Sequence, residues 1–523
     1  MFTVLTFVAF TSLVAFYSWY SIRKDKLDSK DGYFLGGRSL TGTVIAGSML
    51  LTNISTEHLI GMNGSAYKNG FIIIAWEVTS AVALVVAALF FIPRYLRMGL
   101  TTIPEYLEHR FDGATRTMVA LFLLVSFVIT LLPIVLYTGA INLESIFGLA
   151  EGLGLSQEEG LLVTVVAIGV VGSVYAIFGG LKAVAVSDTL NGYGLIIGGL
   201  AVPVIALMSI GDGNLFAGLS KVYHHSPEKF NVIGARDSVL PFEVLFTGLI
   251  INQLYFWGMN QTIIQRALGA KNLVEAQKGL LYTGALKIMI PVIIVLPGVI
   301  GYYYFGNSLY DRQDMIYPEL IKKVLPLGLA GFFAAVIMGA VLSTFNSVLN
   351  SAATIFSVDV YKRHISPSIA DNKLVKIGKI CSTVLALFAI VAAPMVGHAP
   401  DGLYQLLQQL NGIFFIPIAS IMLAGFFIKK VSAAGAKAGL ATGLLFYLLT
   451  TLIFKVNIHF VHLWAIEFLL NLAVMLAVSF YYPSPVQAQP SVVTEMSGWK
   501  YAKPMSIVLC LVTVAIYILL GKT

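Results

Sequence analysis

Long apolar runs recur along this chain from end to end, and they constrain its fold more than any other feature. The runs lie at roughly 2–21, 40–66, 70–96, 116–147, 160–180, 187–210, 241–267, 276–304, 326–361, 376–397, 401–427, 432–454, 458–481 and 503–521. Most have about twenty residues or more, which is the length that an α-helix needs to cross a bilayer. None shows the alternating pattern of a membrane barrel strand. The sequence therefore predicts an all-α integral membrane protein with about 14 transmembrane helices.

The formal charge of +7 raises the question of an anionic partner, and the positions of the basic residues answer it. If the first connection faces the cytoplasm, that side carries 23 basic residues, Arg266 among them, and the other side carries 9. Such an asymmetry sets membrane orientation. We therefore expect no nucleic-acid partner, but a multi-pass protein of the plasma membrane, in a bacterium the inner membrane, with both termini outside.

Lys287, Glu57 and Glu77 are ionisable residues well within apolar runs, and Asp188 lies near the inner end of the sixth run. A charge at the bilayer centre costs about 2.5–3.5 kcal/mol on insertion scales, so such residues usually line a polar cavity. The alternative is a structural ion pair that holds helices together. For Lys287 and Glu77 we favour a place in the wall of a cavity.

Two runs are interrupted by polar residues at matching places. The second contains Thr52-Asn-Ile-Ser-Thr-Glu-His58, and the seventh contains Asn252-Gln253 and then Tyr255-Phe-Trp-Gly-Met-Asn-Gln261. They are five runs apart, the spacing expected of two five-helix repeats of opposite topology. Paired interruptions of this kind indicate a binding site at the membrane midplane. A packing kink is the simpler alternative, and the pairing makes it less attractive.

The ninth run carries a stripe of small polar residues on one helical face, at Ser343, Ser347, Asn350 and Thr354, with Thr344 beside it. Hydroxyl groups of this kind often join membrane helices to one another. They can equally supply hard oxygen ligands to a small cation. The residues alone leave both readings open.

Four stretches make the chain resemble the sodium/solute symporters, specifically the sodium–sugar cotransporter branch. They are Asn53-Ile-Ser-Thr-Glu-His-Leu-Ile-Gly-Met, Thr102-Ile-Pro-Glu-Tyr-Leu-Glu-His-Arg-Phe, Trp257-Gly-Met-Asn-Gln-Thr-Ile-Ile-Gln-Arg-Ala-Leu-Gly-Ala-Lys-Asn and Asn350-Ser-Ala-Ala-Thr-Ile-Phe-Ser-Val-Asp-Val-Tyr. The resemblance extends from about Asp31 to Lys430. It implies a single transmembrane domain over 1–523. Within it, 40–427 form a core of two inverted five-helix repeats with discontinuous first helices, 1–39 an extra helix and loop, and 428–523 peripheral helices.

The resemblance also implies a co-transported sodium ion between the second and ninth runs. Its ligands would be the backbone oxygens of Leu51, Ile54 and Ala340 and the hydroxyls of Ser343 and Thr344. Asp188 matches an aspartate linked to the cation pathway, and with Ser347 it could hold a second sodium. Asn346 weakens this second site, because relatives often carry a hydroxyl there.

For the solute, the resemblance implies a set of hydrogen-bonding positions and two apolar gates. The solute positions are Asn53, His58, Glu77, Ser80, Lys287 and Gln408; the outer gate is Met62, Trp76 and Tyr404; the inner gate is Phe256. The chain departs from relatives in two places. Phe256 lacks the tyrosine hydroxyl usual there, and Gln253, a further solute position, is one methylene longer than the asparagine of a bacterial galactose carrier.

Neutral donors and acceptors around a compensated Glu77–Lys287 pair suit a hydroxylated, uncharged guest. The sequence thus predicts sodium-coupled symport of a small polar solute, most simply a monosaccharide, by alternating access. Another solute (inositol, an amino acid or an organic anion) or a channel is the alternative. No nucleophile–base pair or metal-ligand spacing indicates an enzyme, and we expect no organic cofactor.

Overall fold

The computed structural model describes residues 2–398, 403–483 and 496–521, and every regular element in these ranges is a helix. Helices of ten or more residues are α1 (Phe2–Ile22), α3 (Gly42–Asn53), α5 (Ala75–Val86), α8 (Gly113–Val125), α9 (Leu132–Phe147), α11 (Gln157–Ile210), α12 (Leu215–His225), α13 (Gly248–Gly258), α15 (Leu273–Met289), α17 (Leu296–Phe305), α19 (Leu327–Ile355), α20 (Asp371–Ala392), α21 (Leu403–Phe427), α22 (Ala433–Leu448), α23 (Phe460–Tyr481) and α24 (Ala502–Leu520). Shorter ones are α2 (Lys30–Phe34), α4 (Asn63–Asn69), α6 (Ile92–Arg97), α7 (Ile103–Arg110), α10 (Leu149–Leu153), α14 (Gln261–Leu268), α16 (Pro291–Ile294) and α18 (Ile316–Val324).

Ten helical stretches of the described chain are long and apolar enough to cross a membrane, or eleven if the pair Leu273–Met289 and Pro291–Phe305, bent by 41°, counts as one span. This count is lower than the number of predicted runs because some counted stretches join two runs across a non-helical glycine, as Gln157–Ile210 does at Gly180. The stretch His58–Arg97, for example, includes parts of the second and third runs. Large apolar side chains on the outer helices, such as Leu511 and Ile518 of α24, are exposed, as expected for a surface that faces lipid.

The fifth and sixth predicted runs follow each other without a loop in α11, which consists of two helices that meet at Gly180. Gly180 bends this helix with a φ of 58°, a left-handed backbone that favours glycine. The backbone oxygen of Tyr33 also approaches so closely that a Cβ at Gly180 would collide with it. The two predicted helices are therefore separated at Gly180, and a single glycine makes the break without a loop.

The backbone is broken in both runs where polar interruptions predicted a break. Helix α3 ends at Asn53, Ile54 is extended (φ −87°, ψ 91°), and helix resumes in the π-helix η2 (Glu57–Met62). Helix α13 ends at Gly258, and Asn260 caps α14 by accepting from the Thr262 amide. The second break is shorter than the interruption in the sequence, because Asn252 and Gln253 remain helical.

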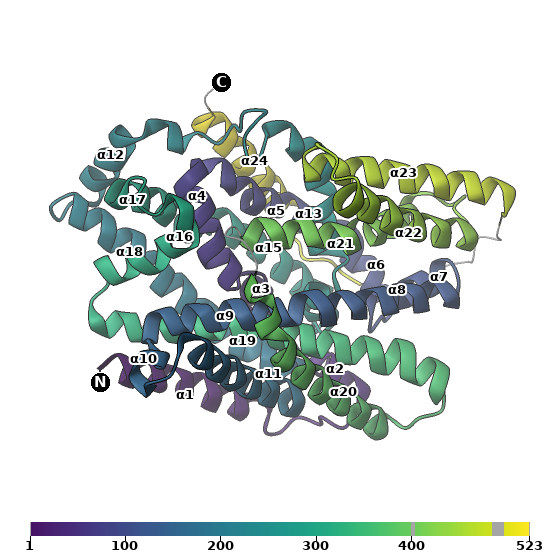
Figure 1. Cartoon of the computed structure of the whole chain (residues 1–523). Helices are drawn as coiled ribbons and strands as arrows, with labels where there is room; N and C mark the ends of the chain where they lie inside the picture. Colours follow the sequence, from purple (N-terminus) through teal and green to yellow (C-terminus); the bar gives the residue numbers. More distant parts are fainter. Residues whose placement is uncertain (1, 399–402, 484–495, 522–523) are drawn as a thin grey trace.

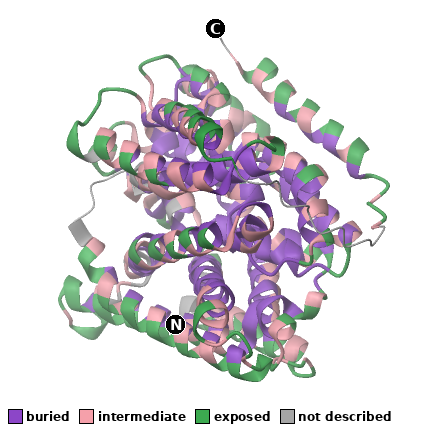
Figure 2. Ribbon diagram, turned by 90° about the vertical axis from the view of Figure 1, so that its right-hand side faces the viewer, coloured by how far each residue is buried: buried purple, intermediate pink, exposed green. Residues whose placement is uncertain are grey.

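Of the broken helices, α3 packs against the long helices α11, α15 and α19, and α13 packs against α5, α21 and α23 (Figure 1). Helix α19 packs against α11, α3 and α9, and α15 packs against α3 and α5. Helices α22 and α23 form a pair at one edge of the molecule. Buried residues concentrate in the centre, whereas the peripheral helices are largely exposed (Figure 2). This arrangement surrounds both chain breaks with protein, as irregular backbone at membrane depth requires.

Candidate functional site

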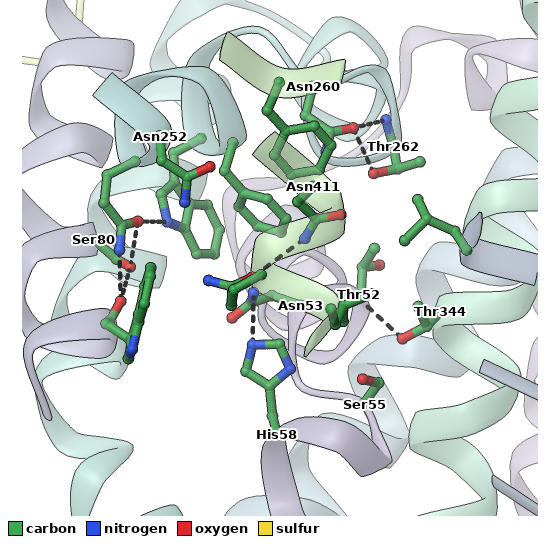
Figure 3. A pocket seen from close by; sticks show the side chains of 18 of the residues that line it. Thr52, Asn53, Ser55, His58, Ser80, Asn252, Asn260, Thr262, Thr344 and Asn411 are labelled. Carbon is green, nitrogen blue, oxygen red and sulfur yellow. Dashed lines mark hydrogen bonds between the residues drawn. The ribbon is translucent and has the colours of Figure 1, made fainter. Parts of the chain in front are cut away.

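A polar cavity of about 80 Å³ lies where the two broken helices meet α5, α19 and α21 (Figure 3). One water needs about 10–15 Å³ of such space, so the cavity has room for several waters or a small polar guest. Its lining residues are Thr52, Asn53, Ser55, His58, Trp76, Glu77, Ser80, Leu131, Asn252, Gln253, Phe256, Trp257, Asn260, Thr262, Thr344, Val348, Leu407, Gln408, Asn411 and Phe415. Six predicted solute positions are among them.

Lys287 is not among the described residues that line the cavity and lies behind Glu77. It forms a buried ion pair with Glu77 and donates to Asn53 Oδ1 at 2.6 Å. Asn53 Nδ2 is 3.5 Å from His58 Nε2 (Figure 3). Lys287 therefore orients Asn53 and balances the charge of Glu77, which leaves a nearly neutral wall on this side.

Gln253 joins α13 to α5 through a closed set of hydrogen bonds. Its Nε2 donates to the Trp76 carbonyl at 2.7 Å, and its Oε1 accepts from Ser80 Oγ at 3.0 Å and from Trp257 Nε1 at 3.1 Å. The extra methylene relative to asparagine gives the amide the reach for this contact between helices. Gln253 and Ser80 thus line the cavity, but much of their hydrogen-bonding capacity is used within the protein.

On the α21 side, the structure adds a residue that sequence reasoning missed. Asn411 lines the cavity, and its Nδ2 donates to Gln408 Oε1 at 3.2 Å. Its signal in the sequence was the spacing of three residues from Gln408, which puts both amides on one helical face. Two aromatic rings, Phe256 and Phe415, lie nearby with centroids 6.5 Å apart. They give the cavity an apolar wall beside its amides.

The predicted gate residues fall into three groups. Trp76 and Phe256 line the cavity. Met62 is fully buried but is not among the described residues that line it. The side chain of Tyr404 lies outside the part of the chain whose side chains are described.

Two of the predicted sodium ligands, the Thr344 hydroxyl and the Ala340 carbonyl, lie where α19 passes the end of α3. Thr344 Oγ1 donates to the Thr52 carbonyl at 3.1 Å and to the Ala340 carbonyl at 3.3 Å. Ser343 Oγ is buried and interacts with the Asp188 carboxylate. Leu51 and Ile54 are fully buried at the end of α3. Hydroxyl and carbonyl oxygens from two helices therefore converge at one break.

A second polar cluster is centred on Arg266, which we had counted with the cytoplasmic connections. Its side chain is fully buried, so it lies in the interior of the protein and not in an exposed connection. Its guanidinium donates to Ser48 Oγ at 3.1 Å and to Ser347 Oγ, and lies 3.7 Å from the Asp188 carboxylate. Asp188 also accepts from Ser48 Oγ at 2.6 Å. In the sequence, Asp188 was an acidic residue near the end of the sixth run with no evident counter-charge, and this indicated that a basic partner would lie nearby.

Ion pairs also join the connecting helix α7 to the start of α8 and to η9 (Phe356–Ile365), which follows α19. Arg116 pairs with Glu108 and with Asp359, each at 2.6 Å, and Arg363 pairs with Glu108. Partial burial would raise the pKa of the Glu108 carboxyl, but the hydrogen bonds from the two arginines outweigh it and lower this pKa. These pairs hold the polar ends of the helices together at one face.

Comparison with known proteins places these features in a family. The family model described as "Sodium:solute symporter family" matches residues 33–443. The chain is 42% identical over 516 residues to the uncharacterized symporter YidK of Escherichia coli (strain K12), covering 98% of this chain and 90% of the relative. It is 35% identical over 448 residues to the sodium/glucose cotransporter of Vibrio parahaemolyticus, covering 82% and 80%.

Among solved structures, the chain is similar to the substrate-bound outward-open state of a Na⁺-coupled sialic acid symporter. The TM-score is 0.80 at 21% identity, and the match covers 93% of this chain and 99% of the other. At this identity the likeness extends to the fold. The predicted resemblance to the symporters is thereby confirmed over most of the chain.

Proposed function

Because the chain belongs to the sodium:solute symporter family, a family of sodium-coupled membrane transporters and not of enzymes, we propose that its solute is a neutral, hydroxylated molecule, in the first place a monosaccharide. The observation that carries this proposal is the Lys287–Glu77 pair beside the cavity. A pocket for an organic anion needs an uncompensated cation, whereas here the lysine is already paired. The relative named for sodium and glucose supports the same substrate class.

The chemistry of the wall suits a ring of hydroxyl groups. Glu77 accepts hydrogen bonds, and Asn53, His58 and Gln408 can both donate and accept. Each bond between a charged and a neutral group is worth about 1.5–3 kcal/mol. The apolar face of a sugar ring can pack on Phe256 or Trp257, which line the same cavity.

For the cation, we assign one sodium to the break after α3. Its ligands are the backbone oxygens of Leu51, Ile54 and Ala340 with the hydroxyls of Ser343 and Thr344. The hydrogen bonds of Thr344 to the carbonyls of Thr52 and Ala340, and the buried Ser343 hydroxyl next to the Asp188 carboxylate, support the assignment.

A second sodium at Asp188 and Ser347 is disfavoured. The guanidinium of Arg266 already supplies a positive charge and hydrogen-bond donors to this pair. A sodium ion there would meet a fixed cation. We therefore propose that Asp188 and Ser347 form an internal ion-pair cluster, and that one sodium accompanies each solute.

The cycle follows alternating access. Sodium orders the break after α3 in the outward-open form, solute binds, and the outer gate of Met62, Trp76 and Tyr404 closes. Both then leave inward past Phe256. One inward charge gains about 2.3 kcal/mol per 100 mV, which at about 1.4 kcal/mol per decade supports roughly fifty-fold accumulation.

The finer architecture belongs to the same proposal. We assign about 14 spans, with 40–427 as two inverted five-helix repeats, 1–39 as an additional helix and loop, and 428–523 as peripheral helices. The two breaks, in α3–η2 and α13–α14, support the repeat. The asymmetry of basic residues supports an orientation with both termini outside the inner membrane.

The test is sodium-driven uptake of labelled glucose and galactose into vesicles, with myo-inositol, an amino acid and a carboxylate as competitors. We expect saturable accumulation that sugars compete for and that stops without sodium. Competition by the carboxylate alone would exclude the sugar. Uptake that neither saturates nor needs sodium would indicate a channel.

A further inference from the structure

Glu467 is a second buried carboxyl, located in α23 and away from the solute cavity. Its side chain is fully buried, and neither carboxyl oxygen has a hydrogen-bond partner among the described residues. It forms no ion pair with any described lysine, arginine or histidine. An ionised carboxylate without donors or a counter-charge is among the costliest groups to bury in a membrane. The structure must therefore neutralise Glu467 in another way.

The packing of α22 on α23 shows what faces this carboxyl. A Cβ added at each of three glycines of α22 would collide with α23: Gly435 with Ser479, Gly439 with Met475 and Gly443 with Asn471. Each step of four residues along α22 moves four residues back along α23, so the two helices are antiparallel. Small residues in such a seam let helices approach closely. One further turn brings Tyr447 opposite Glu467, and these two groups interact electrostatically.

The other titratable groups around this position are engaged elsewhere or carry no charge. Lys437 of α22 is bonded to Asp112 at 2.8 Å, and it lies more than two helical turns from Tyr447. His462 of α23 is 3.1 Å from Thr247 Oγ1. Helix α13 offers only Tyr255, and the described side chains of α21 include no titratable group. No described cation is left to compensate Glu467.

A proton on the Glu467 carboxyl would remove its charge and also provide a hydrogen-bond donor for Asn471. Asn471 lies one turn along the same face of α23, and its buried Oδ1 also has no hydrogen-bond partner among the described residues. A protonated Glu467 is neutral and supplies an O–H donor on this face, where only acceptors lack partners. We propose that Glu467 is a proton-binding site, occupied when α23 is seated against α22 and α21.

The position of Glu467 connects this site to the solute cavity. Trp464, three residues earlier on α23, donates from Nε1 to Tyr447 Oη at 3.3 Å, and its ring centroid is 6.2 Å from that of Trp76. Tyr447 Oη donates in turn to the Gln409 carbonyl at 2.8 Å, next to Gln408 of the cavity. Loss of the proton would place a charge beside Tyr447 and disturb both contacts. Glu467 itself touches neither the proposed sodium ligands nor the cavity wall, so its role is additional to the proposed transport function.

Infrared difference spectroscopy on protein in bilayers tests the proton directly. The spectrum of the wild type minus that of Glu467→Gln should contain the carbonyl stretch of a protonated carboxylic acid at neutral pH. Glu77→Gln is the matched control, because Glu77 is paired with Lys287 and its removal should abolish a carboxylate band instead. If Glu467→Gln also removes a carboxylate band, the proposal is wrong.

Sodium-driven uptake measured from mildly acidic to mildly alkaline pH tests the link to the cavity. Wild-type uptake should fall several-fold at alkaline pH, whereas Glu467→Gln, which cannot ionise, should keep the acidic-pH rate throughout. Superimposable profiles would overturn the link. If Glu467→Gln does not fold, Tyr447→Phe replaces it in the infrared experiment: loss of the facing hydroxyl should shift the acid band, and an unchanged spectrum would contradict the proposed site.

Discussion

Lys287 on α15 and Glu77 on α5 form a buried ion pair, and the same ammonium group donates to Asn53 at the end of α3. Three helices therefore meet at one side chain that does not itself line the cavity. Lys287 thus balances the charge of Glu77 without lining the cavity. A sequence alone would assign charge balance and solute contact to the same residues.

We predict that Lys287→Met destabilises the protein by about 3–5 kcal/mol, because it leaves a buried carboxylate uncompensated. The double variant Lys287→Met/Glu77→Gln should recover most of this stability, since no charge remains, but not uptake. Thermal unfolding in detergent with the uptake assay measures both. Full uptake by the double variant would remove the pair from the proposed solute site.

Ser343→Ala should raise the sodium concentration needed for half-maximal uptake by about ten- to hundredfold, because a lost charged-to-neutral contact is worth about 1.5–3 kcal/mol. Thr383→Ala is the matched control, since this hydroxyl is exposed and bonds only to the Lys379 carbonyl of its own helix. An unchanged sodium dependence in Ser343→Ala would place the ion elsewhere.

If Arg266 serves as the fixed cation of the Asp188 cluster, uptake should depend hyperbolically on sodium, with a Hill coefficient of about one. The initial rate of uptake over a range of sodium concentrations measures this. A sigmoidal dependence would instead indicate a second ion and would overturn the assignment of Asp188 and Ser347 to an internal cluster.

The Glu108 pairs should make stability sensitive to acid. Because the arginines lower the pKa of Glu108 in the folded protein, its contribution is complete above the unfolded pKa of about 4.3 and is lost as the pH falls through the lower, folded value. The melting temperatures of the wild type and Glu108→Gln should therefore differ at neutral pH and converge in acid. Glu228→Gln, at an exposed position, should match the wild type throughout.

Much of the site could be predicted because its polar residues stand out against apolar runs. The breaks near Asn53 and Asn260 were visible as interruptions, and Glu77 and Lys287 as charges at membrane depth. Asn411 was harder to see, because a single amide near another in a long apolar helix is a weak signal. The buried position of Arg266 was not predicted, because a basic residue near the end of a run resembles one in a connection, and only its contacts distinguish the two.

The sequence by itself determined that the chain is helical and lies in a membrane, because bilayer thickness dictates the length of an apolar helix. It also determined where the backbone is interrupted, since polar residues in apolar runs are costly wherever they occur. Only the tertiary structure decided which side chains become partners: that Lys287 lies behind Glu77, that Gln253 joins two helices, that Arg266 meets Asp188 and that Glu467 has no described counter-charge. Those pairings depend on how distant helices pack, and hydropathy along one chain carries no information about contacts between them.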